Sequence, residues 1–189
     1  RQLWLGSWAS ERAQVVAGTE GARNPFWSAD SQWIGFFVDN SLKKVPLSSG
    51  TPQTIATGVP SLSIGGATWN SSGIILLSMT NSLWRVSAQG GALEQATTPH
   101  STSGEGGHLW PRFLSDGNHF IYSGVNPTGI YLGALDGAKP RILQPLRAAS
   151  VLEYVPGYIV YVAPDGGLFA RPFDDEASRF VGDPLRIVD

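Results

Sequence analysis

Residues 26–38 read Phe-Trp-Ser-Ala-Asp-Ser-Gln-Trp-Ile-Gly-Phe-Phe-Val and carry the strongest structural signal in the chain. Two aromatic residues, Phe26 and Trp27, come before a turn rich in Ser and Asp. A continuous apolar run then extends over residues 33–38. Short apolar runs bounded by turn residues, and rich in aromatic side chains, are typical of buried strands. The stretch therefore predicts two β-strands joined by a tight turn.

The same pattern returns three more times along the chain. Its opening aromatics, Trp27, Trp69, Phe113 and Tyr154, are spaced by 42, 44 and 41 residues. After the opening strand, each unit continues with a turn, two apolar strands and a last short strand. A period of about 40 to 45 residues with four short strands is typical of a β-propeller blade. One such sheet cannot bury both of its faces alone, so the units must stack around an axis.

The sequence thus predicts an all-β protein, a β-propeller of four-stranded antiparallel blades, as one domain or part of one over residues 1–189. Four full blades at about 22–57, 65–98, 108–144 and 150–189 follow an N-terminal half blade at 1–18. In that half blade, residues 3–6 resemble a third strand and residues 13–16 a fourth, and the best helical stretch, 10–16, is short.

The half blade lacks its first two strands, which leaves an open edge. We therefore expect further blades in a longer protein, self-association of two copies through that edge, or an incomplete blade. The chain begins Arg1-Gln2-Leu3-Trp4, inside a strand-like pattern and without Met or a signal peptide, as expected of a segment excised from something longer.

Composition argues against several classes of protein. The formal net charge is −2 and the basic residues are scattered, so no basic stripe for nucleic acid is visible. The chain has no cysteine, which excludes disulfides, thiolate catalysis and Cys-ligated zinc. No apolar run approaches the roughly 18 residues of a membrane helix, so no membrane insertion by this segment is expected.

The strand-opening motifs resemble those of the TolB-like, PD40-type branch of the WD40-like propellers, in which an aromatic precedes Ser-Pro-Asp-Gly. Here residues 27–31 read Trp-Ser-Ala-Asp-Ser and residues 113–117 read Phe-Leu-Ser-Asp-Gly. Residues 24–27, 110–113 and 171–174 are similar to the propeller region that follows the kinase domain in many bacterial serine/threonine protein kinases. The resemblance implies a sensor or interaction platform that is periplasmic or otherwise extracytoplasmic.

Motifs for catalysis are absent from the sequence. There is no kinase phosphate loop, His-Arg-Asp or Asp-Phe-Gly motif, and no Gly-x-Ser-x-Gly elbow. Residues 104–107, Gly-Glu-Gly-Gly, are interpreted as an inter-blade loop. The three histidines lack metal-ligand spacing, and the acidic run 174–176 is more typical of a solvated turn than of a calcium site. We expect no catalytic residue, cofactor or metal.

Two sets of repeated residues are expected to be structural. Asp30 and Asp116 occupy the same turn of their own blades, where an Asp side chain accepts hydrogen bonds from nearby backbone N–H groups. The strand-opening aromatics are expected to fill the wedge between blades.

The innermost strand of a propeller blade lines a central channel, so the residues just before each opening aromatic are the candidate binding residues. They are Arg23, Asn24, Thr68, His108, Trp110, Arg112 and Glu153. The third unit departs most from the repeat, because Glu105, His108, Trp110 and Arg112 add charge and an aromatic ring. Trp and Arg are typical anchor residues, and the expected ligand is a protein, peptide or glycan at the channel mouth.

Two alternative functions remain open at this stage. One is a TolB-like periplasmic scaffold that binds an envelope protein. The other is a propeller hydrolase or lyase, which would need polar side chains from several blades to converge within hydrogen-bonding reach. Only His108 and Glu153 are candidates for such a pair.

Overall fold

The computed structural model describes the chain except for residues 8–9, 49, 61–64, 100–106, 126 and 189. Glu105, His100 and most of the loop 104–107 therefore lie outside the described residues. Within the described part, the chain forms nineteen strands and no helix, which confirms the predicted all-β class. It follows that no described helix is long and apolar enough to cross a membrane.

Each of the four sequence repeats forms an antiparallel sheet whose strands pair in chain order. The first sheet consists of β3 (Arg23–Trp27), β4 (Trp33–Val38), β5 (Ser41–Pro46) and β6 (Gln53–Thr57). The second consists of β7 (Ala67–Trp69), β8 (Ile74–Met79), β9 (Ser82–Ser87) and β10 (Glu94–Gln95). The third consists of β11 (Leu109–Phe113), β12 (His119–Gly124), β13 (Gly129–Ala134) and β14 (Arg141–Pro145).

The fourth sheet is built on the same plan with one addition. Its strands are β15 (Leu152–Val155), β16 (Tyr158–Val162), β17 (Leu168–Asp174) and β19 (Leu185–Val188). The extra strand β18 (Arg179–Phe180) pairs with the end of β17, opposite Phe173 and Asp174. This short hairpin was not predicted, because two residues carry too little pattern to be recognised as a strand.

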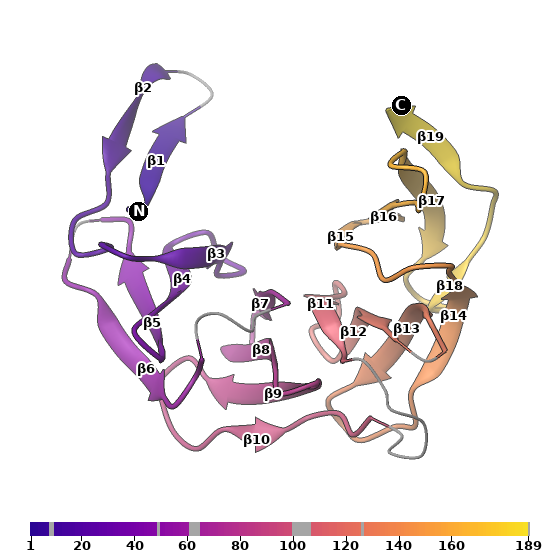
Figure 1. Cartoon of the computed structure of the whole chain (residues 1–189), viewed down its shortest axis with the longest axis horizontal. Coiled ribbons are helices and arrows are strands. Elements are labelled where there is room, and N and C mark those ends of the chain that lie inside the picture. The colour runs from indigo at the N-terminus through magenta and orange to yellow at the C-terminus, as the bar shows by residue number, and fades with distance from the viewer. Residues whose placement is uncertain (8–9, 49, 61–64, 100–106, 126, 189) are drawn as a thin grey trace.

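The N-terminal residues form a separate two-stranded sheet of β1 (Trp4–Ser7) and β2 (Ser10–Val15). The stretch 10–16, the best helical candidate by sequence, is thus a strand, because its pairing with β1 outweighs a weak local preference. In Figure 1 the hairpin and the four blades follow one another around an open arc. The strands β3, β7, β11 and β15 lie on its inner side, and the hairpin and last blade stand at its two ends.

The hydrophobic core is divided among the contacts between successive sheets. One cluster joins the first and second blades through Phe26, Phe37 and Ile75, and another joins the second and third through Leu76 and Phe120. Similar clusters join the third blade to the fourth, and the hairpin to the first blade. Each sheet therefore depends on its neighbours for burial, as the repeat predicts.

The strand-opening aromatics pack toward the preceding blade, with one exception. Trp69 packs against the cluster of the first two blades, and Phe113 belongs to the cluster of the second and third. Trp27, in contrast, is 50% exposed, so the expectation that it fills a wedge is wrong. The reason is that the sheet before it has only β1 and β2 and lacks the inner strands that would cover the indole.

The repeated turn aspartates have the structural role predicted for them. Asp30 accepts hydrogen bonds from the Ser28 hydroxyl and the Gln32 N–H, and these bonds lower its pKa. Asp116 accepts from the N–H groups of Asn118 and His119 and contacts the His119 ring. Partial burial works to raise the pKa of Asp116, but these hydrogen bonds outweigh it and hold the pKa below its ordinary value.

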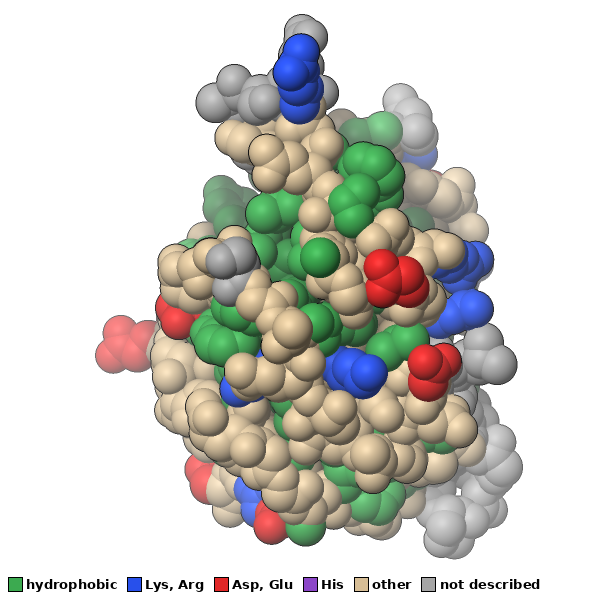
Figure 2. Space-filling model, turned by 90° about the vertical axis from the view of Figure 1, so that its left-hand side faces the viewer, with side chains coloured by type: hydrophobic (Ala, Val, Ile, Leu, Met, Phe, Trp, Pro, Cys, Tyr) green, Lys and Arg blue, Asp and Glu red, His purple; other side chains and the backbone are tan. Residues whose placement is uncertain are grey.

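Charged groups are dispersed over the described surface that Figure 2 shows, which views the arc from the hairpin side. Hydrophobic side chains gather on this face below the hairpin tip, whereas basic and acidic side chains are interspersed.

The acidic run near the C-terminus forms a turn, in which Asp174 accepts from the Ala177 N–H and Asp175 accepts from the Tyr154 hydroxyl.

Candidate functional site

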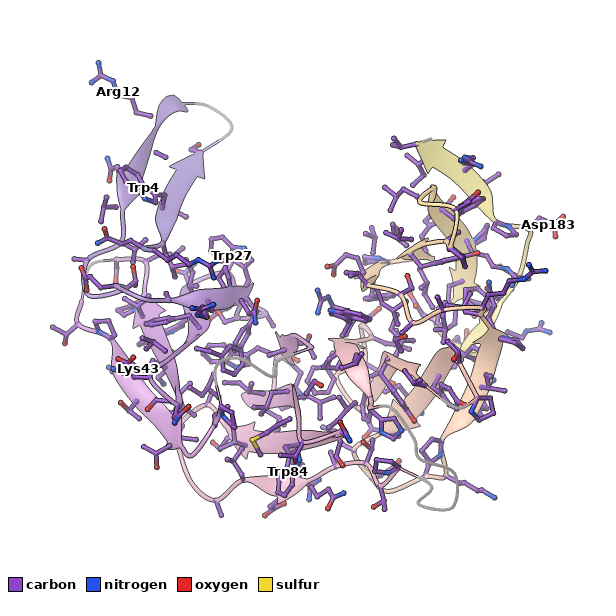
Figure 3. The ribbon with its side chains drawn as sticks, viewed as in Figure 1. Trp4, Arg12, Trp27, Lys43, Trp84 and Asp183 are labelled. Atoms are coloured by element: carbon purple, nitrogen blue, oxygen red, sulfur yellow. The ribbon has the colours of Figure 1, made fainter. Side chains whose placement is uncertain are left out.

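A hollow of about 400 Å³ lies along the inner strands of the arc. The first strand of every blade contributes to its wall, from β3 through β7 and β11 to β15. Its lining residues are Asn24, Pro25, Phe26, Trp27, Gly66, Ala67, Thr68, Trp110, Arg112 and Glu153. Figure 3 shows Trp27 on the inner side of the arc, whereas Lys43 and Trp84 lie toward its outside.

At three of the four inner strands, the residue three positions before the opening aromatic has a left-handed backbone conformation. These residues are Asn24 with φ 45°, Gly66 with φ 90° and Trp110 with φ 50°. In β3 and β11 the following residue is proline, and the strand pairing is interrupted there by a bulge. Bulges redirect side chains and end regular pairing. The bends therefore turn three inner strands so that these residues line the hollow.

Arg112 connects three blades at the wall of the hollow. Its Nε donates to both carboxylate oxygens of Glu153 in β15, each at 3.0 Å. Its Nη1 donates to the carbonyls of Pro111 and, at 3.4 Å, of Ala67 in β7. The Arg112 side chain is 22% exposed and that of Glu153 is 55% exposed. The ion pair thus holds two blades together while one side of it still faces solvent.

The second blade supplies the floor between the two tryptophans. Gly66, Ala67 and Thr68 are small, and a Cβ atom on Gly66 would lie 3.4 Å from the Trp110 ring. The Thr68 hydroxyl accepts a hydrogen bond from the Phe113 N–H at 3.3 Å, which ties β7 to β11. Small residues here leave room for the indole and keep the hollow open.

His108 lies in a different hollow, between the outer parts of the second and third blades. Its Nδ1 is 2.7 Å from the Thr97 hydroxyl, and its ring packs at 4.7 Å against Tyr122, whose pKa is raised by burial. Arg23 begins β3 opposite Phe37 and is not among the residues that line the inner hollow. The structure therefore brings Trp110, Arg112 and Glu153 together and leaves His108 and Arg23 elsewhere.

Two features of the site were not predicted from the sequence. Arg112 and Glu153 each stand one residue before the opening aromatic of neighbouring blades, and this shared repeat position was the signal for an ion pair. Trp27 was assigned to the core, although it lines the hollow. Nothing in the local sequence distinguishes it from Trp69, because its exposure depends on the neighbouring sheet.

No protein-family model matches the sequence, and no curated protein matches it either. The fold, however, is shared with solved structures. TolB from Acinetobacter baumannii superimposes with a TM-score of 0.75 and 13% identity, over 100% of this chain and 48% of that chain. A chain of the mitotic checkpoint complex superimposes with a TM-score of 0.71 and 14% identity, over 98% of this chain and 59% of that one.

An auxiliary nutrient binding protein from Bacteroides thetaiotaomicron is similar as well, with a TM-score of 0.68 and 9% identity over 88% of this chain and 41% of that chain. This chain thus spans about half the length of these three solved chains. At these identities the likeness concerns the fold. The chain is an arc of four β-propeller blades and a half blade, with a TolB-like and WD40-like architecture.

Proposed function

We propose that the chain is a non-catalytic binding module that takes its ligand at the inner-strand hollow. The observation that carries this proposal is the convergence of Trp110, Arg112 and Glu153 on one open hollow of about 400 Å³. Concave sites with apolar walls and a few convergent polar groups are the usual sites for ligands. Tryptophan and arginine are also the side chains that most often anchor a bound partner.

In this proposal the module is the extracytoplasmic sensor region of a larger bacterial protein. The resemblance of residues 24–27, 110–113 and 171–174 to kinase-associated propellers favours a serine/threonine kinase as that larger protein. The structure adds a physical reason for a role in sensing. Arg112 touches three blades, so a ligand that rearranges the Arg112–Glu153 pair would alter the packing of β11 against β15.

A TolB-like periplasmic scaffold is the second candidate function. The superposition on TolB, which extends over 100% of this chain, favours it. The two candidates differ in the partner that they require, because a scaffold needs a defined envelope protein. Co-purification of one such protein from an envelope extract, lost in Trp110→Ala, would favour the scaffold over a sensor for small ligands.

The hydrolase or lyase alternative is the least supported of the three. It needs His108 and Glu153 to act on one substrate, but the two residues lie in separate hollows, with His108 beside Thr97 and Glu153 beside Arg112. The non-catalytic proposal is therefore preferred.

The proposed function is tested by screening the purified chain against peptides, glycans and envelope proteins, together with Trp110→Ala and Glu153→Gln. The expected result is one ligand class that binds the chain and is weakened by both substitutions. Reproducible turnover of any substrate by the isolated chain would overturn the proposal. So would a ligand whose affinity is unchanged in both variants.

A further inference from the structure

The charges of the inner hollow neutralise each other. Among the described residues of its lining, Arg112 is the only basic one and Glu153 the only acidic one. The Arg112 Nε donates to both carboxylate oxygens of Glu153. An anionic ligand would have to compete with Glu153 for the guanidinium, and a cationic ligand would have to compete with Arg112. The hollow therefore favours a ligand without net charge.

Two indole rings flank the small residues of the second blade. Trp27 contributes from β3 and Trp110 from β11, with Gly66 and Ala67 between them in the lining. Neither indole N–H has a hydrogen-bond partner within the described residues, and the same is true of Arg112 Nη2. The hollow thus offers apolar ring faces next to three hydrogen-bond donors that remain available.

The inner strands β3 and β11 are poor templates for an added peptide strand. Strand addition needs a row of free backbone N–H and C=O groups along a regular edge. Pro25 and Pro111 remove an N–H from β3 and β11, and the bulges beside them break the regular spacing. Recognition along β3 and β11 must therefore come mainly from side chains.

We infer that the ligand of the inner hollow is a neutral carbohydrate, an inference that rests on the proposed function. A sugar ring has apolar C–H faces that can stack on the indole of Trp110, and a rim of hydroxyl groups. Those hydroxyls can accept from Arg112 Nη2 and donate to Glu153, whose carboxylate is half exposed. This combination of neutral charge, flat apolar faces and many hydroxyls fits the hollow better than a phosphate, a carboxylate or an extended peptide.

The test follows the tryptophan indole N–H signals of the ¹⁵N-labelled chain by NMR. The probes are neutral tetrasaccharides (cellotetraose, maltotetraose and chitotetraose), the anionic tetragalacturonate, and a set of proline-containing pentapeptides. Trp110→Phe assigns the Trp110 signal and Trp110→Ala removes the ring. Trp4→Ala serves as the matched control, because Trp4 is 64% exposed on the N-terminal hairpin and does not line the hollow.

We expect at least one neutral tetrasaccharide to shift the Trp110 signal saturably, and tetragalacturonate to leave it in place. Trp110→Ala should weaken that binding about tenfold or more, whereas Trp4→Ala should leave it unchanged. Peptide binding that moves Trp110, with no response to any saccharide, would overturn the carbohydrate inference and leave the proposed function standing. Saccharide binding that survives Trp110→Ala would overturn the inference, and a Trp110 signal that no probe moves would count against both.

Discussion

Phe113 and Trp27 occupy the same position of the repeat, yet one is 8% exposed and the other 50% exposed. Phe113 follows a complete blade of four strands, and its ring packs among Leu76, Leu83 and Phe120. Trp27 follows the two-stranded hairpin. Burial of an opening aromatic thus depends on the preceding sheet. In the middle of the arc each inner face is covered by a four-stranded blade, whereas at the N-terminal end only the two-stranded hairpin precedes β3.

The same difference separates the candidate site from the ends of the arc. The inner strands of the second, third and fourth blades are tied together by Thr68 and Arg112. The ends instead expose large apolar side chains, among them Trp4 and Val15 on the hairpin and Leu185 and Ile187 on β19. A binding site needs rigid elements around it, and the middle of the arc supplies them.

The largest effect is expected from truncating the two opening aromatics. Phe113→Ala should lower the free energy of unfolding by about 3 to 4 kcal/mol, because it leaves a cavity between two blades. Trp27→Ala should cost less than about 1 kcal/mol, since half of the ring is already in water. Urea unfolding followed by circular dichroism measures both. Equal losses would contradict the comparison.

A pair of glycines tests the same contrast with a single added methyl group. A Cβ atom at Gly35 in the first blade would lie 2.2 Å from the Phe26 ring, which is buried against Phe37 and Trp69. Gly35→Ala should therefore cost about 1 to 3 kcal/mol through overpacking. At Gly6 in the hairpin the added Cβ would meet Ala13 at an ordinary 3.8 Å, so Gly6→Ala should be neutral. Thermal unfolding of the two variants gives the answer, and a neutral Gly35→Ala would show that the Phe26 ring can move.

A smaller effect is expected at the ion pair of the inner wall. Arg112→Met should lower stability by about 1 to 2 kcal/mol, because it removes hydrogen bonds that join three blades. The control is Arg85→Met. Arg85 pairs with Glu94 at more exposed positions, 39% and 61%, and makes one hydrogen bond to the third blade, at the Leu135 carbonyl. Its loss should cost less than about 1 kcal/mol. Chemical unfolding that ranks the two variants in the opposite order would show that the inner wall is not held by Arg112.

The smallest effect is expected for the pH dependence of stability that comes from Asp116. The hydrogen bonds to Asp116 hold its folded-state pKa below the unfolded value of about 3.9. Their stabilisation is therefore present above that pH and is lost as pH falls through the folded pKa. Asp116→Asn should remove less than about 1 kcal/mol near neutral pH, because the side chain is half exposed, and should flatten the pH profile below about 4. Asp183→Asn, at an exposed site, controls for the lost charge, and identical profiles for the two variants would contradict this account.

The repeat itself was enough to predict the blades. The 41-to-44-residue spacing and the apolar runs are local features, and the strands β4, β8, β12 and β16 lie where those runs are. The residues placed just before the opening aromatics also proved to lie on the inner wall at Asn24, Thr68, Trp110, Arg112 and Glu153. Periodicity within a blade was therefore sufficient to locate one wall of the hollow.

Features that depend on neighbouring blades could not be read from the sequence in this way. The exposure of Trp27 depends on strands that the preceding sheet lacks. The place of His108 depends on packing against Tyr122, a residue of β12, the strand that pairs with the inner strand β11. The Arg112–Glu153 pair joins residues 41 positions apart. Such contacts are set by how the blades stack rather than by local preference.

The central claim is that the blades in the middle of the arc are more stable than the N-terminal hairpin. The most direct test is native-state hydrogen exchange, measured for each backbone amide. The account predicts that amides of β8 and β12 exchange only through global unfolding, that those of β7 and β11 follow closely, and that β1 and β2 exchange with a much lower opening free energy. Protection of β1 and β2 equal to that of β8 would contradict the account, because it would show that the half blade is as stable as a complete one.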